Sequence, residues 1–166
     1  ACQWLIEMGA DALPAERADA LARLWHLTPE QRERFDVALN RWLRSSVRAE
    51  LLAWPCIRAE VPFFSLGCED EGIARYGAYA EGAIDALATD PADPSRALVI
   101  DYKTGGTPDE MPDQLLEKHA LQARVYADVL HKAGVETVTV KFVRVEQTNP
   151  AIFVEPAEPQ VVTYNL

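Results

Sequence analysis

The sequence lacks several features that would place it in common protein classes. Its three cysteines, Cys2, Cys56 and Cys68, form no CxxC pair, and its three histidines do not lie beside them. Zinc sites and iron–sulfur clusters need about four soft ligands. The scattered cysteines therefore argue against both kinds of site and favour reduced thiols in a cytoplasmic protein. No stretch approaches the ~18 uninterrupted apolar residues of a membrane span, and the first residues lack the pattern of a secretory signal.

Basic residues are also scarce, since 16 Lys and Arg stand against 26 Asp and Glu, giving a formal net charge of −10. Phosphate contacts need Lys and Arg, so this balance argues against generic nucleic-acid binding. It remains compatible with a nuclease, because hard-metal sites consist of carboxylates and a neighbouring domain can supply a basic track. The 166 residues, 49% hydrophobic and 25% charged, suit one globular domain.

Residues 1–50 are predicted to be helical. Thr28 is the expected N-cap of a helix that begins at Pro29, with Gln31 at the capping-box position. We interpret the tryptophans of this segment as core anchors. Apolar residues recur here at helical spacing, at Leu21, Leu24, Trp25, Phe35, Leu39, Trp42 and Leu43.

The pattern changes at residue 57. Three strand-like segments, 57–66, 78–88 and 97–103, are separated by turn-prone stretches at 67–72 and 90–95, which predicts a β-meander. The stretch 104–108 ends the third strand. A helix is expected from about Met111 to Lys132, with Gly134 as its left-handed cap. Alternation predicts a strand over 135–146, and 160–166 is a further candidate strand.

Polar residues fall at consistent positions on these strands. Period-two geometry places Asp101 and Lys103 on one face of the third strand and Tyr102 on the other. An acid and a lysine would be costly in a sealed core, so a cleft or a metal is expected beside them. If the second and third strands are neighbours, Asp85 and Asp101 converge. Their carboxylates, a backbone carbonyl and waters would suit Mg²⁺ or Mn²⁺, with Glu60 as a third strand-borne acid.

Such a group suits phosphodiester hydrolysis, in which a metal acidifies water and neutralises phosphate charge and Lys103 stabilises the developing charge. For Asp101 and Lys103 alone, a solvated ion pair is the better reading. The four residues together favour a site. On the long helix Gln122 and Tyr126 share a face with His119. Gln122 is a candidate partner of a phosphate or an acid, whereas Tyr126 alone would be read as the edge of a core helix.

Four segments, in order, resemble the PD-(D/E)xK nuclease superfamily, specifically the RecB-type nuclease domain of AddA-like helicase–nucleases. They are AEVPF (59–63), EGAID (81–85), VIDYKTG (99–105) and QARVYA (122–127). The resemblance implies an α/β (α+β) fold with a restriction-endonuclease-like mixed sheet flanked by helices, and Mg²⁺-dependent cleavage of DNA. It implies metal ligands at Asp85, Asp101 and the Tyr102 carbonyl, a catalytic Lys103 and a first-strand acid at Glu60. Gln122 and Tyr126 would border the site.

The resemblance also implies a biological context. Residues 1–166 would be a single nuclease domain fragment, with a helical segment at 1–50 and a core at 57–166. It would be the C-terminal part of a cytoplasmic helicase–nuclease in double-strand break repair and recombination. The expected partners are DNA, the helicase portion of the same chain and an AddB-like subunit, with no membrane.

One departure from the RecB type concerns a metal-ligating histidine. Domains of this type supply it from an early helix in a GxxxH-like motif, which this sequence lacks. His26, in LWHL, is interpreted as the end of a helix. We expect the chain to begin just downstream of the missing histidine, and we expect weak metal binding and cleavage by the isolated fragment.

Three alternatives stay open. The first is a non-catalytic module of the same fold that holds DNA or a partner subunit. The missing histidine and the acidity favour it, and the intact Asp85, Asp101 and Lys103 oppose it. The second is an iron–sulfur nuclease, against which the cysteine pattern argues. The third is a small-molecule Mg²⁺ phosphoesterase or a plain α/β domain, which requires four accidental matches in the right order.

Overall fold

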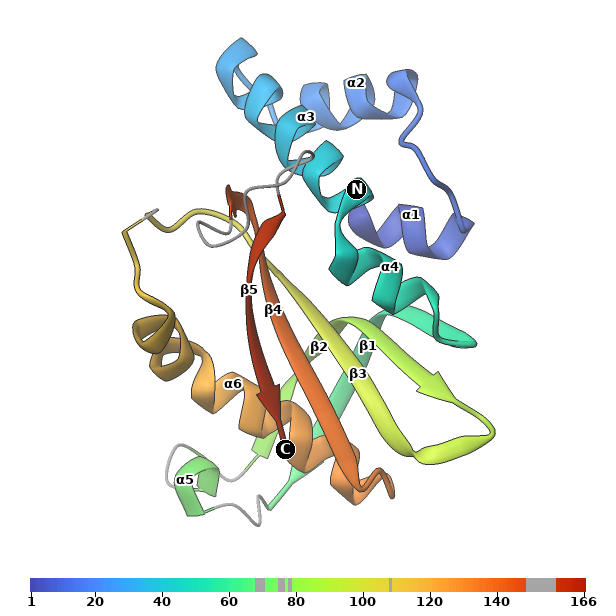
Figure 1. Cartoon of the computed structure of the whole chain (residues 1–166), viewed down its shortest axis with the longest axis vertical. Helices are drawn as coiled ribbons and strands as arrows, with labels where there is room; N and C mark the ends of the chain where they lie inside the picture. Colours follow the sequence, from blue (N-terminus) through green and yellow to red (C-terminus); the bar gives the residue numbers. More distant parts are fainter. Residues whose placement is uncertain (68–70, 75–76, 78, 108, 149–157) are drawn as a thin grey trace.

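In the computed structural model, the chain folds into a five-stranded sheet with helices packed against both faces (Figure 1). It describes residues 1–67, 71–74, 77, 79–107, 109–148 and 158–166. The predictions for Cys68, for residues 69–70 of the expected turn, for Ala78 and for Pro108 fall outside the described residues. The elements are α1 (Cys2–Met8), α2 (Ala15–Leu24), α3 (Pro29–Arg44), α4 (Ser46–Leu52), β1 (Cys56–Leu66), α5 (Glu71–Ala74), β2 (Tyr79–Asp90), β3 (Asp93–Lys103), α6 (Pro112–Lys132), β4 (Thr137–Thr148) and β5 (Pro159–Asn165).

The four helices α1–α4 confirm the helical first segment. The capping box of α3 is present: the Gln31 N–H donates to Thr28 Oγ1 (3.3 Å) and the Thr28 N–H donates to Gln31 Oε1 (2.9 Å). Trp42 is a core anchor at 1% exposure, but the same interpretation is wrong for Trp25, which is 71% exposed. Trp25 is the C-cap of α2, and the chain turns away there because the next residue has a φ of 50°.

Trp42 and Trp25 form a matched pair for a stability measurement. Trp42 is buried against α4 and the sheet, with its ring 4.8 Å from the Tyr102 ring. We expect Trp42→Ala to lower the free energy of unfolding by about 3–5 kcal/mol, as loss of a buried aromatic side chain does. Trp25→Ala should change it by less than about 0.5 kcal/mol. Urea denaturation of both variants checks this, and equal losses would contradict the assigned core.

The sheet has the order β1-β2-β3-β4-β5. Strands β1, β2 and β3 form the predicted antiparallel meander, β4 lies parallel to β3, and β5 returns antiparallel to β4. The parallel pair requires a crossover, and α6 provides it. The predicted turn at 90–95 was too long, because β3 already begins at Asp93 and only Pro91 and Ala92 form the turn. Glu71 and Gly72, also predicted as turn, lie in α5.

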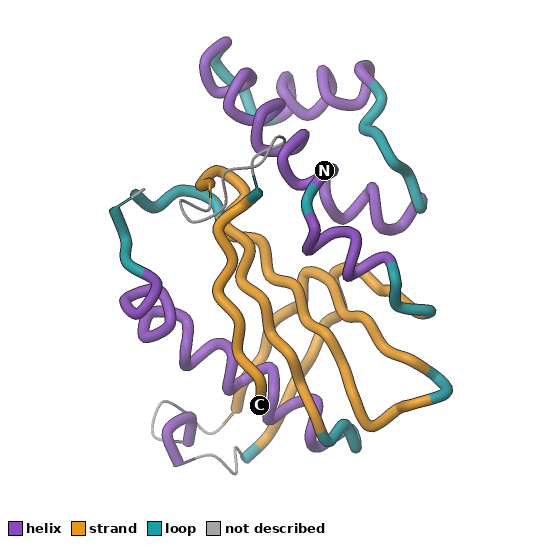
Figure 2. Tube along the Cα trace, viewed as in Figure 1, coloured by secondary structure: helices purple, strands orange, loops and turns teal. Residues whose placement is uncertain are grey.

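Each face of the sheet carries its own buried cluster. Helix α6 covers one face, and helices α1, α3 and α4 pack on the other (Figure 2). Val99 of β3 packs towards α6, whereas Leu98 and Ile100 pack towards α3 and α4. Burial on both faces explains why residues 97–100 are continuously apolar rather than alternating. β3 is therefore the central strand of the sheet and is buried on both faces.

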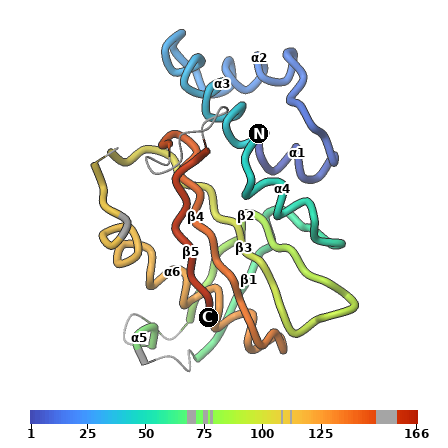
Figure 3. Tube along the Cα trace, viewed as in Figure 1, coloured from blue at the N-terminus to red at the C-terminus, as the bar shows by residue number. Residues whose placement is uncertain are grey.

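The second half of the chain follows the predicted order of helix and strands (Figure 3). Helix α6 ends at Lys132, and Gly134 has a φ of 93°, which confirms the left-handed residue expected after it. Strands β4 and β5 confirm the two last strand predictions to within about two residues. No helix among the described residues is both long and apolar enough to cross a membrane.

Candidate active site

Strands β2 and β3 stop pairing at the level of two acidic residues. Ala86 and Ile100 form the last pair, and Asp85 and Asp101 are the next residues along each strand. The Tyr102 backbone N–H donates to Asp85 Oδ2 at 2.8 Å. Because a buried N–H needs an acceptor, this carboxylate oxygen replaces a strand carbonyl. The sheet thus opens where the two predicted carboxylates begin.

Asp101 is almost fully enclosed, with 3% exposure. Lys103 Nζ lies 2.7 Å from its Oδ1. On its other oxygen, Oδ2, Gln122 Nε2 and the Tyr126 hydroxyl each donate at 2.8 Å. These contacts confirm that Asp101 and Lys103 share a face, and they place the two helix residues from α6 directly against the acid. Burial and three donors do not fit the alternative of a solvated Asp–Lys pair.

Lys103 is held in place by two acceptors. Besides Asp101, its ammonium donates to Gln122 Oε1 at 2.9 Å. The side chain is 27% exposed. Of its three N–H groups, the third has no hydrogen-bond partner in the part of the chain that the structure describes. A fixed, partly exposed cation with one donor to spare can contact an anionic substrate.

Gln122 and Tyr126 are linked to each other as well as to Asp101. Gln122 Nε2 donates to the Tyr126 hydroxyl at 2.7 Å, and this hydroxyl donates onward to Asp101. Burial, followed by the negative charge of Asp101, raises the pKa of Tyr126. The tyrosine therefore stays a neutral donor. Tyr126 therefore bonds the site acid directly, which the alternative interpretation as the edge of a core helix did not predict.

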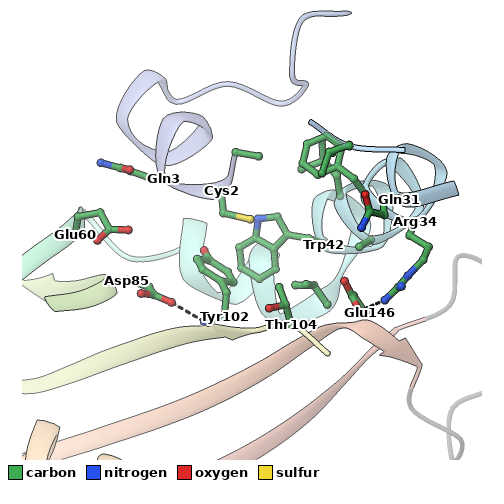
Figure 4. Close-up of a pocket in the computed structure, with 16 residues that line it drawn as sticks. Cys2, Gln3, Gln31, Arg34, Trp42, Glu60, Asp85, Tyr102, Thr104 and Glu146 are labelled. Carbon is green, nitrogen blue, oxygen red and sulfur yellow. Dashed lines mark hydrogen bonds and ion pairs between the residues drawn. The ribbon is translucent and has the colours of Figure 1, made fainter. Parts of the chain in front are cut away.

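Glu60 lies opposite Asp85. In the β1–β2 register, Ala59 pairs with Ala86 and Val61 with Ile84, and Glu60 and Asp85 fall between these pairs. Glu60 has a φ of 49°, a conformation that non-glycine residues adopt rarely and that tends to occur at functional sites. Figure 4 shows the Glu60 and Asp85 carboxylates at the same end of a cavity. The structure therefore brings the first-strand acid next to the second.

The Asp85 carboxyl has a raised pKa. Burial is the largest cause, and the negative charges of Asp101 and Glu60 add to it, while the Tyr102 N–H and the charge of Lys103 act in the opposite direction. A carboxyl whose pKa is higher in the folded than in the unfolded protein favours folding most below its unfolded pKa. That contribution is lost as the pH rises through the folded pKa.

This linkage predicts a pH-dependent effect of Asp85→Asn. In metal-free buffer the variant should melt a few degrees above the wild type at pH 7, since a neutral amide avoids the buried charge. The gain should shrink as the pH falls and the wild-type carboxyl becomes protonated. Thermal unfolding across pH checks this, with Asp11→Asn as the control because the Asp11 side chain is 90% exposed. A gain that does not vary with pH would contradict the account.

Tyr102 directs its side chain to the opposite face, as period two predicts. Its ring meets the Trp42 ring edge-on, and its buried hydroxyl has no hydrogen-bond partner within the described residues. Burial raises the pKa of Tyr102. The side chain therefore packs against Trp42 and lines the same cavity as Glu60 and Asp85 (Figure 4), while the backbone N–H of Tyr102 bonds the Asp85 carboxylate.

A cavity of about 560 Å³ extends from Asp85 and Glu60 between the sheet and helices α1 and α3. Two charged residues of its wall were not among the predicted site residues: Arg34 on α3 and, near the end of β4, Glu146. Its Oε2 accepts from Arg34 of α3 (2.8 Å) and from the Gly105 N–H (3.2 Å), so it ties the loop after β3 to the helical face (Figure 4). Regular alternation of residues 135–146 concealed this role. Nothing in the sequence separates Glu146 from Glu136 and Arg144, the other charged residues at the same period-two positions.

The donors at the opening suit a hard divalent cation. Asp85, Asp101 and the Tyr102 carbonyl offer oxygen ligands, and Asp85 Oδ1 accepts no hydrogen bond from any described residue. A cation there would also relieve the repulsion that raises the Asp85 pKa. Among the described residues no three His, Cys, Asp or Glu side chains group closely enough to hold a metal. Water would have to fill the remaining positions.

His26 is exposed after the end of α2, which confirms its interpretation as a helix end.

Comparison with known proteins gives one finding. The family described as the PD-(D/E)XK nuclease superfamily matches residues 3–165, which is nearly the whole chain. A search of curated proteins finds no match. The family's name describes an aspartate followed at a distance by an acid, one further residue and a lysine, an order that Asp85 and Asp101-Tyr102-Lys103 have. The mixed sheet flanked by helices is consistent with a restriction-endonuclease-like fold. The chain belongs to the PD-(D/E)XK nuclease superfamily.

Proposed function

We propose that the chain is a metal-dependent nuclease domain that hydrolyses phosphodiester bonds in DNA. The observation that carries the proposal is the buried Asp101 joined to Lys103, Gln122 and Tyr126, at the point where β2 and β3 part beside Asp85. Membership of a nuclease superfamily supports the reaction type. Mg²⁺ or Mn²⁺ is the proposed cofactor, because the donors are hard oxygens.

Asp85, Asp101 and the Tyr102 carbonyl would hold the cation. When bound, it supplies neutralisation of phosphate charge and acidification of water. Glu60, which lies at the same end of the cavity as Asp85, would accept a hydrogen bond from the attacking water. The free N–H of Lys103 would donate to a phosphate oxygen as negative charge develops on it, which is worth about 10²- to 10³-fold in rate for a fixed donor.

Gln122 acts through its neighbours and is a positioning residue. It bonds both Asp101 and Lys103, so Gln122→Ala should release both side chains from their common support. We expect kcat to fall by about 10- to 100-fold, as for removal of a group that orients a metal ligand. The KM for DNA should change little. Steady-state kinetics checks this, together with Gln122→Glu, which should not restore kcat because it places a further carboxylate directly beside Asp101. A pure rise in KM would contradict the role.

The RecB-type resemblance supports a wider proposal. In it the chain is the C-terminal nuclease part of an AddA-like helicase–nuclease that works in the cytoplasm with an AddB-like subunit on double-strand breaks. The net charge of −10 supports a basic DNA track elsewhere in such an assembly. The alternative is a weakly active or inactive nuclease-fold module that binds DNA or a partner subunit.

The test uses end-labelled linear and circular DNA, single- and double-stranded, with Mg²⁺, with Mn²⁺ and with EDTA. The proposal expects cleavage with either metal and none with EDTA. Binding without cleavage under every condition would favour the non-catalytic alternative. Equal cleavage with and without EDTA would contradict metal dependence and point to a contaminating nuclease.

A further inference from the structure

A second polar cluster lies beside the active site, on the face of the sheet covered by α6. Its centre is Arg144 of β4, which is in register with Lys103 of β3 and only 3% exposed. The guanidinium donates to Gln160 Oε1, to the Thr107 carbonyl (3.1 Å) and to Glu110 Oε2 (2.5 Å). Thr107 and Glu110 belong to the loop between Lys103 and α6. A buried arginine is thus hydrogen-bonded to the loop that follows the predicted catalytic lysine.

Glu110 is surrounded by donors on both oxygens. Lys118 Nζ lies 2.7 Å from Oε1, and Oε2 accepts from Arg144 and from the Thr107 N–H (3.2 Å). Two cations and a backbone N–H around one anionic group are the partners that a phosphate also prefers. The hydrogen bond from Lys118 is the largest of the effects that lower the pKa of Glu110, so the carboxylate stays ionised.

The surroundings are positively charged although the chain is acidic overall. His119, stacked on Phe142 at 4.7 Å, has a pKa lowered first by burial and then by the charges of Lys103, Lys118 and Arg144. All three cations therefore lie within electrostatic reach of one imidazole. Glu110 and Asp101 are the acids whose carboxylates bond to these cations. The cluster is continuous with the site that would bind the scissile phosphate.

The loop that carries Glu110 passes close to the arginine at Gly106. Gly106 has a φ of 79°, and a Cβ there would lie 2.1 Å from an Arg144 nitrogen and 2.6 Å from Glu110 Oε2. Only glycine lets the loop lie this close to the guanidinium. Lys118, by contrast, is 54% exposed and Glu110 is 24% exposed. Solvent therefore reaches the outer half of the cluster, and moving the Glu110 side chain would expose the inner half.

We propose that Arg144 and Lys118 form a binding site for a backbone phosphate of DNA next to the scissile one, and that Glu110 occupies this site when DNA is absent. The identity of the ligand rests on the proposed nuclease function. The competing account is a structural clasp, in which the ion pairs serve only to hold the loop. A clasp does not need Lys118, because Arg144 already bonds both Thr107 and Glu110.

Two matched pairs of variants separate these accounts. Glu110→Gln and Lys118→Gln alter the cluster, whereas Glu50→Gln and Lys141→Gln make the same charge changes in the ion pair between α4 and β4. Binding of inorganic phosphate is followed by ¹H–¹⁵N NMR titration. Binding of a fluorescent 12-nucleotide DNA is followed by anisotropy in metal-free buffer over a range of salt. Neither readout requires cleavage.

We expect Glu110→Gln to bind phosphate and DNA about 3- to 10-fold more tightly than the wild type, because it removes a competing anion. Lys118→Gln should weaken DNA binding and reduce the slope of log affinity against log salt by about 1, as loss of one phosphate contact does. Neither Glu50→Gln nor Lys141→Gln should change phosphate binding, DNA binding or the salt slope. Unchanged or weaker phosphate binding by Glu110→Gln, or equal effects in the controls, would overturn the inference in favour of the clasp.

Further outcomes keep the two proposals apart. Should Glu110→Gln fail to fold, Lys118→Gln alone decides, since its side chain is half-exposed, and an unchanged salt slope overturns the inference. Phosphate binding that depends on Lys118, in a protein that cleaves no DNA under any metal condition, would support this site while refuting the proposed function. If the protein cleaves DNA with metal, and the Glu110→Gln and Lys118→Gln variants bind DNA as tightly as the wild type, this site is refuted and the proposed function is not.

Discussion

Replacing Asp101 with asparagine is expected to lower kcat/KM for metal-dependent DNA cleavage by about 10³-fold or more. Loss of a metal ligand removes several kcal/mol of transition-state stabilisation. The structure adds a second reason, because Asp101 is also the anchor of Lys103, with 2.7 Å between Lys103 Nζ and Asp101 Oδ1. An amide retains the shape of the side chain but loses the charge on which both functions depend.

The measurement is single-turnover cleavage of labelled DNA at saturating Mn²⁺, with isothermal titration of Mn²⁺ in parallel. Asp101→Asn should lose Mn²⁺ affinity as well as activity. Asp11→Asn is the control, because it makes the same change at a 90% exposed position. Thermal unfolding of both variants tests whether the loss of activity comes from a loss of folding, and we expect both to unfold cooperatively. Wild-type cleavage by Asp101→Asn would contradict the assignment of this residue.

Lys103→Met is expected to lower the rate of cleavage by about 10²- to 10³-fold while Mn²⁺ affinity stays near that of the wild type. The rate falls because a preorganised donor to the developing phosphate charge is lost. Metal binding persists because the carboxylates remain. Lys103→Arg should not restore the rate, since the planar guanidinium cannot reproduce a point charge held between Asp101 and Gln122.

Lys141→Met is the matched control for this variant, because Lys141 is also a partly buried strand lysine in an ion pair, with Glu50 on α4. It should cleave DNA at the wild-type rate. If Lys103→Met instead lost Mn²⁺ binding and activity in proportion, the lysine would be part of the site's scaffold rather than a donor to the substrate.

Much of this fold could be predicted from local patterns. Period two placed Asp101 and Lys103 on one face and Tyr102 on the other, and the ion pair and the Trp42 contact confirm both. The capping residues Thr28 and Gln31 fixed the start of α3. These predictions succeeded because each depends on backbone geometry within a few residues, which is the same in any fold.

What the sequence left open depends on tertiary contacts. Trp25 has the spacing of a buried helix residue, yet it is exposed because α2 ends there and none of the described elements covers its ring. The positive φ of Glu60 occurs where the pairing of β1 with β2 skips one residue on each strand, Glu60 and Asp85. Arg144 is charged but sits on a buried face, and its partners Thr107 and Glu110 come from a distant loop. No spacing rule connects such residues.

The most direct test of the central claim compares wild type and Lys103→Met at equal Mn²⁺ occupancy, with cleavage of labelled DNA as the readout. The account predicts clear metal-dependent cleavage by the wild type and about 10²- to 10³-fold slower cleavage by the variant. Equal rates in the two proteins, with Mn²⁺ bound to both, would show that the cluster of Asp101, Lys103 and Gln122 is not an active site.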